Sequence, residues 1–202
     1  MILYLTRHGQ TQWNAQSKMQ GQCDSPLTPE GYRQAGRLAE RLRGEPIERI
    51  YTSPLSRARN TAGILARGRD LPVLADDRLR ECALGAFEGH SFAEMEKLYP
   101  EAMDNFRHHP ERFEPVGDGE NFHQVRARAA QFLADVAASD CNCVLAVAHA
   151  LVLRVIRTVM LDIGLERMLE GRMSSCCYCR ARWEGGKWHI DAFGESLDNL
   201  GK

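Results

Sequence analysis

Two short apolar runs in this chain stop abruptly at basic side chains. Residues 2–5 lead into Arg7 and His8, and residues 143–148 lead into His149. Continuous apolar runs of this length are typical of strands that are buried on both faces, as in the middle of a parallel sheet covered by helices. We therefore expect two central strands whose carboxyl ends carry basic groups.

Other segments show helical spacing or the marks of a turn. Thr28 before Pro29 predicts a helix start, and Ser91 with Glu94 forms a capping box. A hairpin is expected over residues 174–183 and 187–191, which are separated by a glycine pair. The remaining predictions are helices over residues 29–43, 54–65, 92–98, 120–139 and 152–160, and strands over residues 47–53 and 71–74.

This alternation predicts an α/β fold, a three-layer sandwich with a mostly parallel central sheet flanked by helices and an antiparallel strand at one edge. We expect one domain over residues 1–202, with a frayed end at Gly201 and Lys202. Residues 101–119 are polar and interrupted by prolines and glycines. They form either a solvated surface excursion or, within residues 90–119, a helical or loop lid over the strand ends.

Composition narrows the classes of partner. The 202 residues are 44% hydrophobic, enough for a sizeable core, and a formal net charge of -1 gives no bulk reason to expect nucleic acid or a membrane as partner. No run approaches membrane length, and the first residues lack the basic lead-in of a secretory signal. We expect a cytoplasmic protein, and the choice between a monomer and a homodimer stays open.

The seven cysteines form an odd, scattered set, which argues against a disulfide framework. Cys176 and Cys179 have the C-x-x-C spacing of a zinc or thiol-exchange pair. In the strand predicted there, the two side chains would point to opposite faces of the sheet. We therefore expect small buried side chains rather than a metal site.

Basic side chains recur at the ends of three predicted strands. Arg7 and His8 follow the first, Arg57 lies in the first turn of the helix after the second, and His149 follows the run at 143–148. Because the carboxyl ends of parallel strands share one edge, these groups should converge. A guanidinium in the first turn of a helix is unfavourable unless an anion lies near it. The set predicts a phosphate site, with Gly9 letting the backbone turn closely around it.

The same residues carry a resemblance to a known family. Residues 7–14, RHGQTQWN, resemble the R-H-G-[EQ]-[ST]-x-W-N signature of the histidine phosphatase superfamily, in its phosphoglycerate mutase-like branch. The resemblance continues in consistent order through most of the chain and implies a phosphoglycerate mutase-like fold. Its further segments are residues 20–28, 53–62, 79–81, 88–89, 119–120 and 147–149, with Gly85.

The resemblance implies a phosphohistidine enzyme that needs no metal or cofactor. His8 would attack phosphorus, while Arg7 and Arg57 clamp the phosphoryl oxygens and His149 adds a donor. The neighbouring cations should lower the pKa of His8 and keep its imidazole unprotonated near neutral pH.

Glu81 matches the general acid of the family, and Glu88 is the alternative if the correspondence has slipped. The resemblance also implies substrate contacts from Arg7, Arg57, Glu81, His149, Asn14, Gln20, Gly21 and Ala150. Ala150 departs from the family pattern, which has glycine after the second histidine.

We predict hydrolysis of small phosphomonoesters, with a small phosphorylated metabolite as the partner. The chain resembles the phosphatases of this family, which include broad-specificity and α-ribazole phosphatases. An alternative is a cofactor-dependent phosphoglycerate mutase, although the mutases of this family have a longer insertion and a threonine where this chain has Gln20. A further alternative, of another class, is a non-catalytic regulatory domain that binds phosphate.

Overall fold

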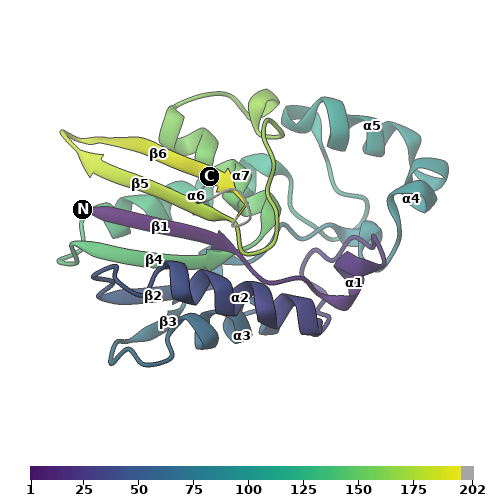
Figure 1. The fold of residues 1–202 in the computed structure, drawn as a ribbon. Coiled ribbons are helices and arrows are strands. Elements are labelled where there is room, and N and C mark those ends of the chain that lie inside the picture. The colour runs from purple at the N-terminus through teal and green to yellow at the C-terminus, as the bar shows by residue number, and fades with distance from the viewer. Residues whose placement is uncertain (197–202) are drawn as a thin grey trace.

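A computed structural model describes residues 1–196, which form one central sheet with helices on both faces (Figure 1). The strand order is β3-β2-β4-β1-β5-β6. Strands β3, β2, β4 and β1 are parallel, and β5 and β6 form an antiparallel hairpin beside β1. The predicted α/β sandwich is confirmed. The strands are β1 (Ile2–Arg7), β2 (Arg49–Thr52), β3 (Val73–Ala75), β4 (Cys143–Ala148), β5 (Tyr178–Glu184) and β6 (Lys187–Glu195).

The layers follow from the two-residue period of the strands. Leu3 and Leu5 of β1 pack into one core, whereas Tyr4 between them packs into the other. One core lies under α2 (Pro29–Arg41) and α3 (Ser56–Leu65), and the other lies under α6 (Phe122–Ala137) and α7 (Ala150–Leu161) (Figure 1). A strand buried on both faces has no polar alternation, which is why β1 and β4 read as continuous apolar runs.

The register of β1 and β4 brings the two predicted histidines together. Arg7 pairs with Ala148, so His8 and His149 each follow directly after that last pair. The backbone N–H of His8 donates to the carbonyl oxygen of Ala148 at 3.0 Å. Two segments about 140 residues apart in sequence therefore end side by side.

Residues 101–119 are more ordered than the sequence predicted. Pro100 follows the end of α4 (Phe92–Leu98), as expected, but it is also the first residue of α5 (Pro100–His108). Proline suits that position because the first helical N–H has no intrahelical partner. Met103 and Phe106 of α5 are buried, so the segment is not wholly solvated. With α1 (Gln12–Ala15), α4 and α5 lie beyond the carboxyl end of β1 (Figure 1).

Four short 3-10 helices complete the described elements: Asp77–Leu79, Gly85–Phe87, Pro110–Arg112 and Leu165–Arg167. The hairpin was predicted to begin near residue 174, but β5 begins at Tyr178, because Cys176 has a positive φ of 51° that no strand accommodates. No helix among residues 1–196 is long and apolar enough to cross a membrane. The frayed end predicted at Gly201 and Lys202 lies outside the described residues.

Candidate active site

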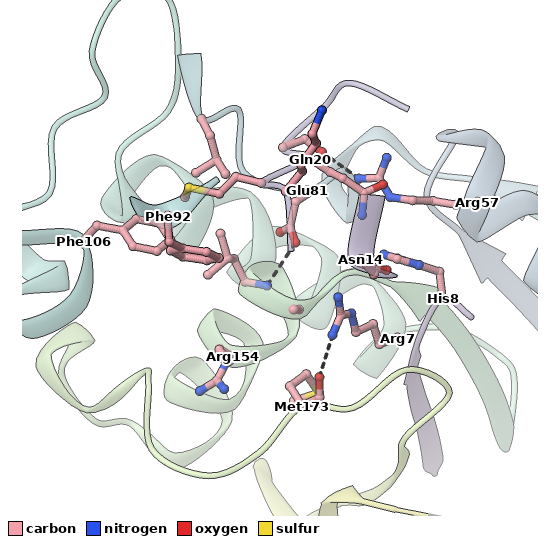
Figure 2. A pocket seen from close by; sticks show the side chains of 16 residues that line it. Arg7, His8, Asn14, Gln20, Arg57, Glu81, Phe92, Phe106, Arg154 and Met173 are labelled. Atoms are coloured by element: carbon pink, nitrogen blue, oxygen red, sulfur yellow. Dashed lines mark hydrogen bonds between the residues drawn. The ribbon is translucent and has the colours of Figure 1, made fainter. Parts of the chain in front are cut away.

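A cavity of about 330 Å³ opens beyond the carboxyl end of β1 (Figure 2). Arg7, His8, Arg57 and Glu81 all line it, although they come from three separate segments of the chain. The convergence predicted from the strand ends is therefore confirmed for Arg7, His8 and Arg57. His149 does not line the cavity, but its ring lies 5.1 Å from the ring of His8, centroid to centroid.

The imidazole of His8 is held in one orientation. Its Nδ1 lies 2.7 Å from the carbonyl oxygen of Gly9, and since a carbonyl only accepts, Nδ1 carries the proton. The lone pair of Nε2 is then free. Burial lowers the pKa of His8 well below its usual value, and the charges of Arg7 and Arg57 lower it further. The predicted direction is confirmed, but burial, which the sequence did not indicate, is the larger cause.

Arg7 and Arg57 are positioned by backbone carbonyls. Arg7 donates to the carbonyl oxygen of Met173 at 2.9 Å, and Arg57 donates to those of Gly21 at 2.6 Å and Cys23 at 2.7 Å. The Nε atoms of both guanidinium groups are buried and have no hydrogen-bond partner among the described residues. Each of the two arginines thus keeps unused donor capacity beside His8.

An anion does lie at the start of α3, but the protein supplies it. Asp24 accepts from the backbone N–H of Ser56 at 2.7 Å and pairs with Arg57 at 3.2 Å. From the sequence, the placement of Arg57 indicates a bound phosphate. The placement alone does not require one, because Asp24 already offsets the helix dipole there.

His149 is oriented by a hydroxyl. Its Nε2 lies 2.7 Å from the Oγ of Ser53, which also accepts from the backbone N–H of Leu55 at 3.3 Å. When the Ser53 hydroxyl donates to Nε2, the proton of the imidazole sits on Nδ1, which is buried without a partner in the described chain. Burial, followed by the charge of Arg57, lowers the pKa of His149 well below its usual value.

Glu81 caps the helix that follows His149. Its carboxylate accepts from the backbone N–H of Leu151 and of Val152, both at 3.2 Å, and from that of Cys82 at 3.0 Å. Figure 2 shows this carboxylate facing the cavity. Glu88, the alternative acid, lies outside the cavity lining.

The other residues predicted to contact substrate lie around the same cavity. Asn14, Gln20, Gly21 and Ala150 all line the cavity. Oδ1 of Asn14 accepts from the backbone N–H of Thr11 at 3.1 Å. Oε1 of Gln20 accepts from the hydroxyl of Ser25 at 3.2 Å, so both amides are held by their oxygens.

Gly9 has a packing role against the start of α2. Gly9 does not line the cavity, and a Cβ built on it would lie 2.5 Å from the carbonyl oxygen of Gly31. Glycine is needed there because the loop after β1 passes directly against the first turn of α2. The small residue thus lets this loop pack closely on the helix, and its approach to an anion stays a prediction.

Several lining residues were missed by the sequence reading. Lys18, Arg154, Phe92 and Phe106 all face the cavity. A signal existed for Arg154, because it lies four residues after Ala150 and so on the same face of α7. Phe92 and Phe106 belong to helices α4 and α5, whose relation to the strand ends no local pattern reveals.

The cysteines around β5 are buried, as predicted, and Cys176, Cys177 and Cys179 all lack a disulfide. The backbone N–H of Cys176 donates to the carbonyl oxygen of Arg7 at 3.0 Å, so the segment supports the end of β1. Within residues 1–196, no three His, Cys, Asp or Glu side chains are grouped as metal ligands.

Comparison with known proteins agrees with this geometry. The sequence profile of the histidine phosphatase superfamily (branch 1) matches residues 3–196. A Hydrogenobacter thermophilus protein provisionally named phosphoserine phosphatase 2 is 33% identical over 185 residues, covering 92% of this chain and 91% of that protein. A Klebsiella pneumoniae protein provisionally named phosphoglycerate mutase GpmB is 35% identical over 191 residues, covering 92% and 86%.

Solved structures are similar over nearly the whole chain. Bacillus stearothermophilus YhfR superposes with a TM-score of 0.91 at 35% identity, covering 96% of this chain and 97% of that one. A mycobacterial glucosyl-3-phosphoglycerate phosphatase in complex with VO3 superposes with a TM-score of 0.88 at 31% identity, covering 96% and 99%. The chain is therefore an enzyme of the histidine phosphatase superfamily, branch 1, with the phosphoglycerate mutase-like fold.

Proposed function

We propose that this protein hydrolyses small phosphomonoesters through a phosphohistidine formed on His8. One observation carries the proposal: three buried nitrogen atoms around His8, Nε of Arg7, Nε of Arg57 and Nδ1 of His149, have no partner among the described residues. Buried donors are rarely left unpaired, because an unsatisfied polar group costs about 1–3 kcal/mol. A phosphoryl group offers the acceptor oxygens that this cluster lacks, once side chains adjust around it.

The chemistry divides one displacement into two. The lone pair of Nε2 of His8 attacks phosphorus, a P–N bond forms, and the P–O bond to the alcohol breaks. Arg7, Arg57 and His149 stabilise the negative charge that develops on the phosphoryl oxygens. Water then attacks phosphorus, the P–N bond breaks, and inorganic phosphate leaves with the His8 imidazole restored.

Glu81 is assigned to proton transfer in both steps. It protonates the departing alkoxide, and as a carboxylate it then takes a proton from the attacking water. The side chain faces the cavity beside Arg7 and His8, as this role requires.

Residues 90–119 are proposed to act as a lid within a single domain over residues 1–202. Phe92 and Phe106 place aromatic surface over the cavity, where it would exclude water from the reacting phosphate. No metal is required in this scheme, because the arginines supply the charge neutralisation that magnesium gives in many other phosphoryl-transfer enzymes. The named relatives include a phosphoserine phosphatase and a glucosyl-3-phosphoglycerate phosphatase, which supports a small phosphorylated metabolite as substrate.

The test is turnover of p-nitrophenyl phosphate in excess chelator. Wild-type protein should release nitrophenol, His8→Ala should not, and intact-protein mass spectrometry should detect a phosphoryl group on the wild type alone. Tight phosphate binding without turnover would instead indicate a binding domain. Faster interconversion of 3-phosphoglycerate with its isomer than hydrolysis would indicate a mutase.

A further inference from the structure

The loop that carries Glu81 belongs to no helix or strand. It spans residues 80–84, between the 3-10 helices Asp77–Leu79 and Gly85–Phe87, and is called the Glu81 loop below. A group that transfers a proton must be placed accurately, because a misplacement of about 1 Å can cost about 100-fold in rate. The loop has no regular hydrogen-bonded structure of its own, so contacts from other segments must fix its position.

Arg128 supplies three of those contacts from helix α6. Its Nη1 donates to the carbonyl oxygens of Arg78 and Arg80, both at 2.7 Å. Its Nη2 donates to the carbonyl oxygen of Glu81 at 3.3 Å. One guanidinium on a regular helix therefore binds the main chain at Glu81 and just before it.

Glu120, which lies just before α6, completes the arrangement. Its carboxylate accepts from Nε and Nη2 of Arg128 at 2.8 and 3.0 Å. The same carboxylate accepts from the backbone N–H of Ala83 at 3.0 Å, and the backbone N–H of Glu120 donates to the carbonyl oxygen of Ala83 at 2.8 Å. Arg128 and Glu120 thus hold the Glu81 loop on both sides of Glu81.

The geometry of this ion pair is specific to arginine. The five hydrogen bonds of Arg128 use all five N–H groups of a guanidinium. A lysine has three donors on one atom and cannot reach the same acceptors. The side chains of Arg128 and Glu120 are only 16% and 23% exposed, so the pair is shielded from water more than an ordinary surface salt bridge.

The two ends of Glu81 are held by different helices. Its carboxylate faces the cavity and accepts from backbone N–H groups at the start of α7 (Figure 2). Its main chain is held from α6 by Arg128, which does not itself line the cavity. A protonated carboxyl group accepts hydrogen bonds more weakly than a carboxylate. The main-chain contact from Arg128 is therefore retained when Glu81 acts as an acid.

We propose that Arg128 is a positioning residue for proton transfer, which holds the main chain at Glu81 so that its carboxyl group reaches the leaving-group oxygen. This inference rests on the proposed function, in which Glu81 is the acid. Loss of Arg128 should slow substrates whose leaving group needs a proton far more than those whose leaving group does not. The selectivity follows because, among the described residues, the hydrogen bonds of Arg128 go only to Glu120 and to the segment at Glu81.

The test compares kcat/KM of the full-length protein for phenyl phosphate and for p-nitrophenyl phosphate. Both carry one aromatic ring, but phenolate is the more basic leaving group and needs protonation more. The readout is the ratio of the two values, because a loss of folded protein lowers both by the same factor. Arg128→Met should lower the ratio of phenyl to p-nitrophenyl phosphate about tenfold or more. Arg128→Lys, which keeps some of the donors, should recover part of it.

A double variant shows whether Arg128 acts through Glu81. Glu81→Gln should itself lower the ratio, because the acid is lost. Arg128→Met added to Glu81→Gln should lower the ratio no further, since two residues that act through one group are not additive. A merely structural role of Arg128 would not make its effect on the ratio depend on Glu81.

Arg126 provides a matched control on the same helix. It donates to the carbonyl oxygen of Ile163 at 2.7 Å and to the hydroxyl of Thr158 at 2.9 Å. Both acceptors lie near the carboxyl end of α7 or just beyond it, away from the Glu81 loop. Arg126→Met should therefore lower the melting temperature and leave the ratio unchanged.

The outcomes separate this inference from the proposed function. An unchanged ratio in Arg128→Met, together with a lowered ratio in Glu81→Gln, would overturn the inference and leave the phosphatase standing. A further fall in the double variant would also overturn it. An unchanged ratio in Glu81→Gln would overturn the inference together with the assignment of the acid. If Arg128→Met does not fold, Glu120→Gln takes its place, with a lowered ratio expected and an unchanged ratio overturning the inference.

Discussion

Glu81 and Glu88 offer an unusually direct test of which carboxylate transfers the proton. Glu88 accepts from the backbone N–H groups of Gln22, Cys23 and Leu84, each at 2.9 Å. Glu81 likewise accepts from three backbone N–H groups. Replacement by glutamine removes one acceptor oxygen in either case and sets an amide N–H against a backbone donor.

The loss can be estimated from these contacts. One hydrogen bond to a charged acceptor contributes about 1.5–3 kcal/mol, and 1 kcal/mol shifts the melting temperature of a chain of this size by about 2–4 °C. Glu88→Gln and Glu81→Gln should therefore both lower the melting temperature by about 3–12 °C. Glu88→Gln should also raise KM, because the loop it holds gives Arg57 the carbonyl oxygens of Gly21 and Cys23.

Only Glu81→Gln should lose the chemical step. Its kcat should fall about 100-fold or more, and the fall should be larger for glycerol 3-phosphate than for p-nitrophenyl phosphate, whose leaving group needs little protonation. Calorimetric melting and steady-state kinetics on both variants give the comparison. Loss of kcat in Glu88→Gln with an unchanged melting temperature would refute the assignment of Glu81.

Further outcomes follow from the two buried histidines. The pKa of His8 lies well below its usual value of about 6.5, so kcat/KM for p-nitrophenyl phosphate should show no loss from protonation of His8 at pH 6. An inflection near pH 6.5 in the profile of kcat/KM against pH, caused by His8, would contradict this. Below about pH 6.5, and down to the lowered pKa values of His8 and His149, the unfolded chain binds more protons than the folded protein does. The contribution of the two neutral histidines to the free energy of unfolding should therefore be complete above about pH 6.5 and decline as the pH falls. Urea unfolding across about pH 5–8 measures this slope, and the same measurement on His149→Gln isolates the share of His149. Ser53→Ala should lower kcat about tenfold, because His149 loses the hydroxyl that orients it. Thr52→Val is the control and should leave kcat unchanged, since the Thr52 hydroxyl donates only to the carbonyl oxygen of Ser53. Equal kcat for the two variants would argue against a role for the contact between Ser53 and His149.

The central strands were predictable because burial on both faces leaves a direct mark on the sequence. The run at β4 matched the observed strand at both ends, and the capping box at Ser91 located α4 correctly. The helix beginning at Pro100 was missed because proline marks the end of one helix and the start of the next equally well. Its two buried side chains, Met103 and Phe106, are too few to produce a clear period in a polar segment.

The site residues that could be predicted from the sequence differ from the others in how the fold positions them. Arg7, His8 and His149 are fixed by strand ends, and parallel pairing brings strand ends to one edge whatever the loops do. Asp24, Phe106 and Lys18 reach the site through loops and a helix pair whose paths depend on tertiary packing. The reaction centre is thus encoded locally, whereas the groups that would choose among alcohols are encoded in the packing between segments. Substitutions among those packed groups can therefore change which substrate is accepted while the phosphate centre remains intact, provided that the support given to Arg57 by Asp24 is kept.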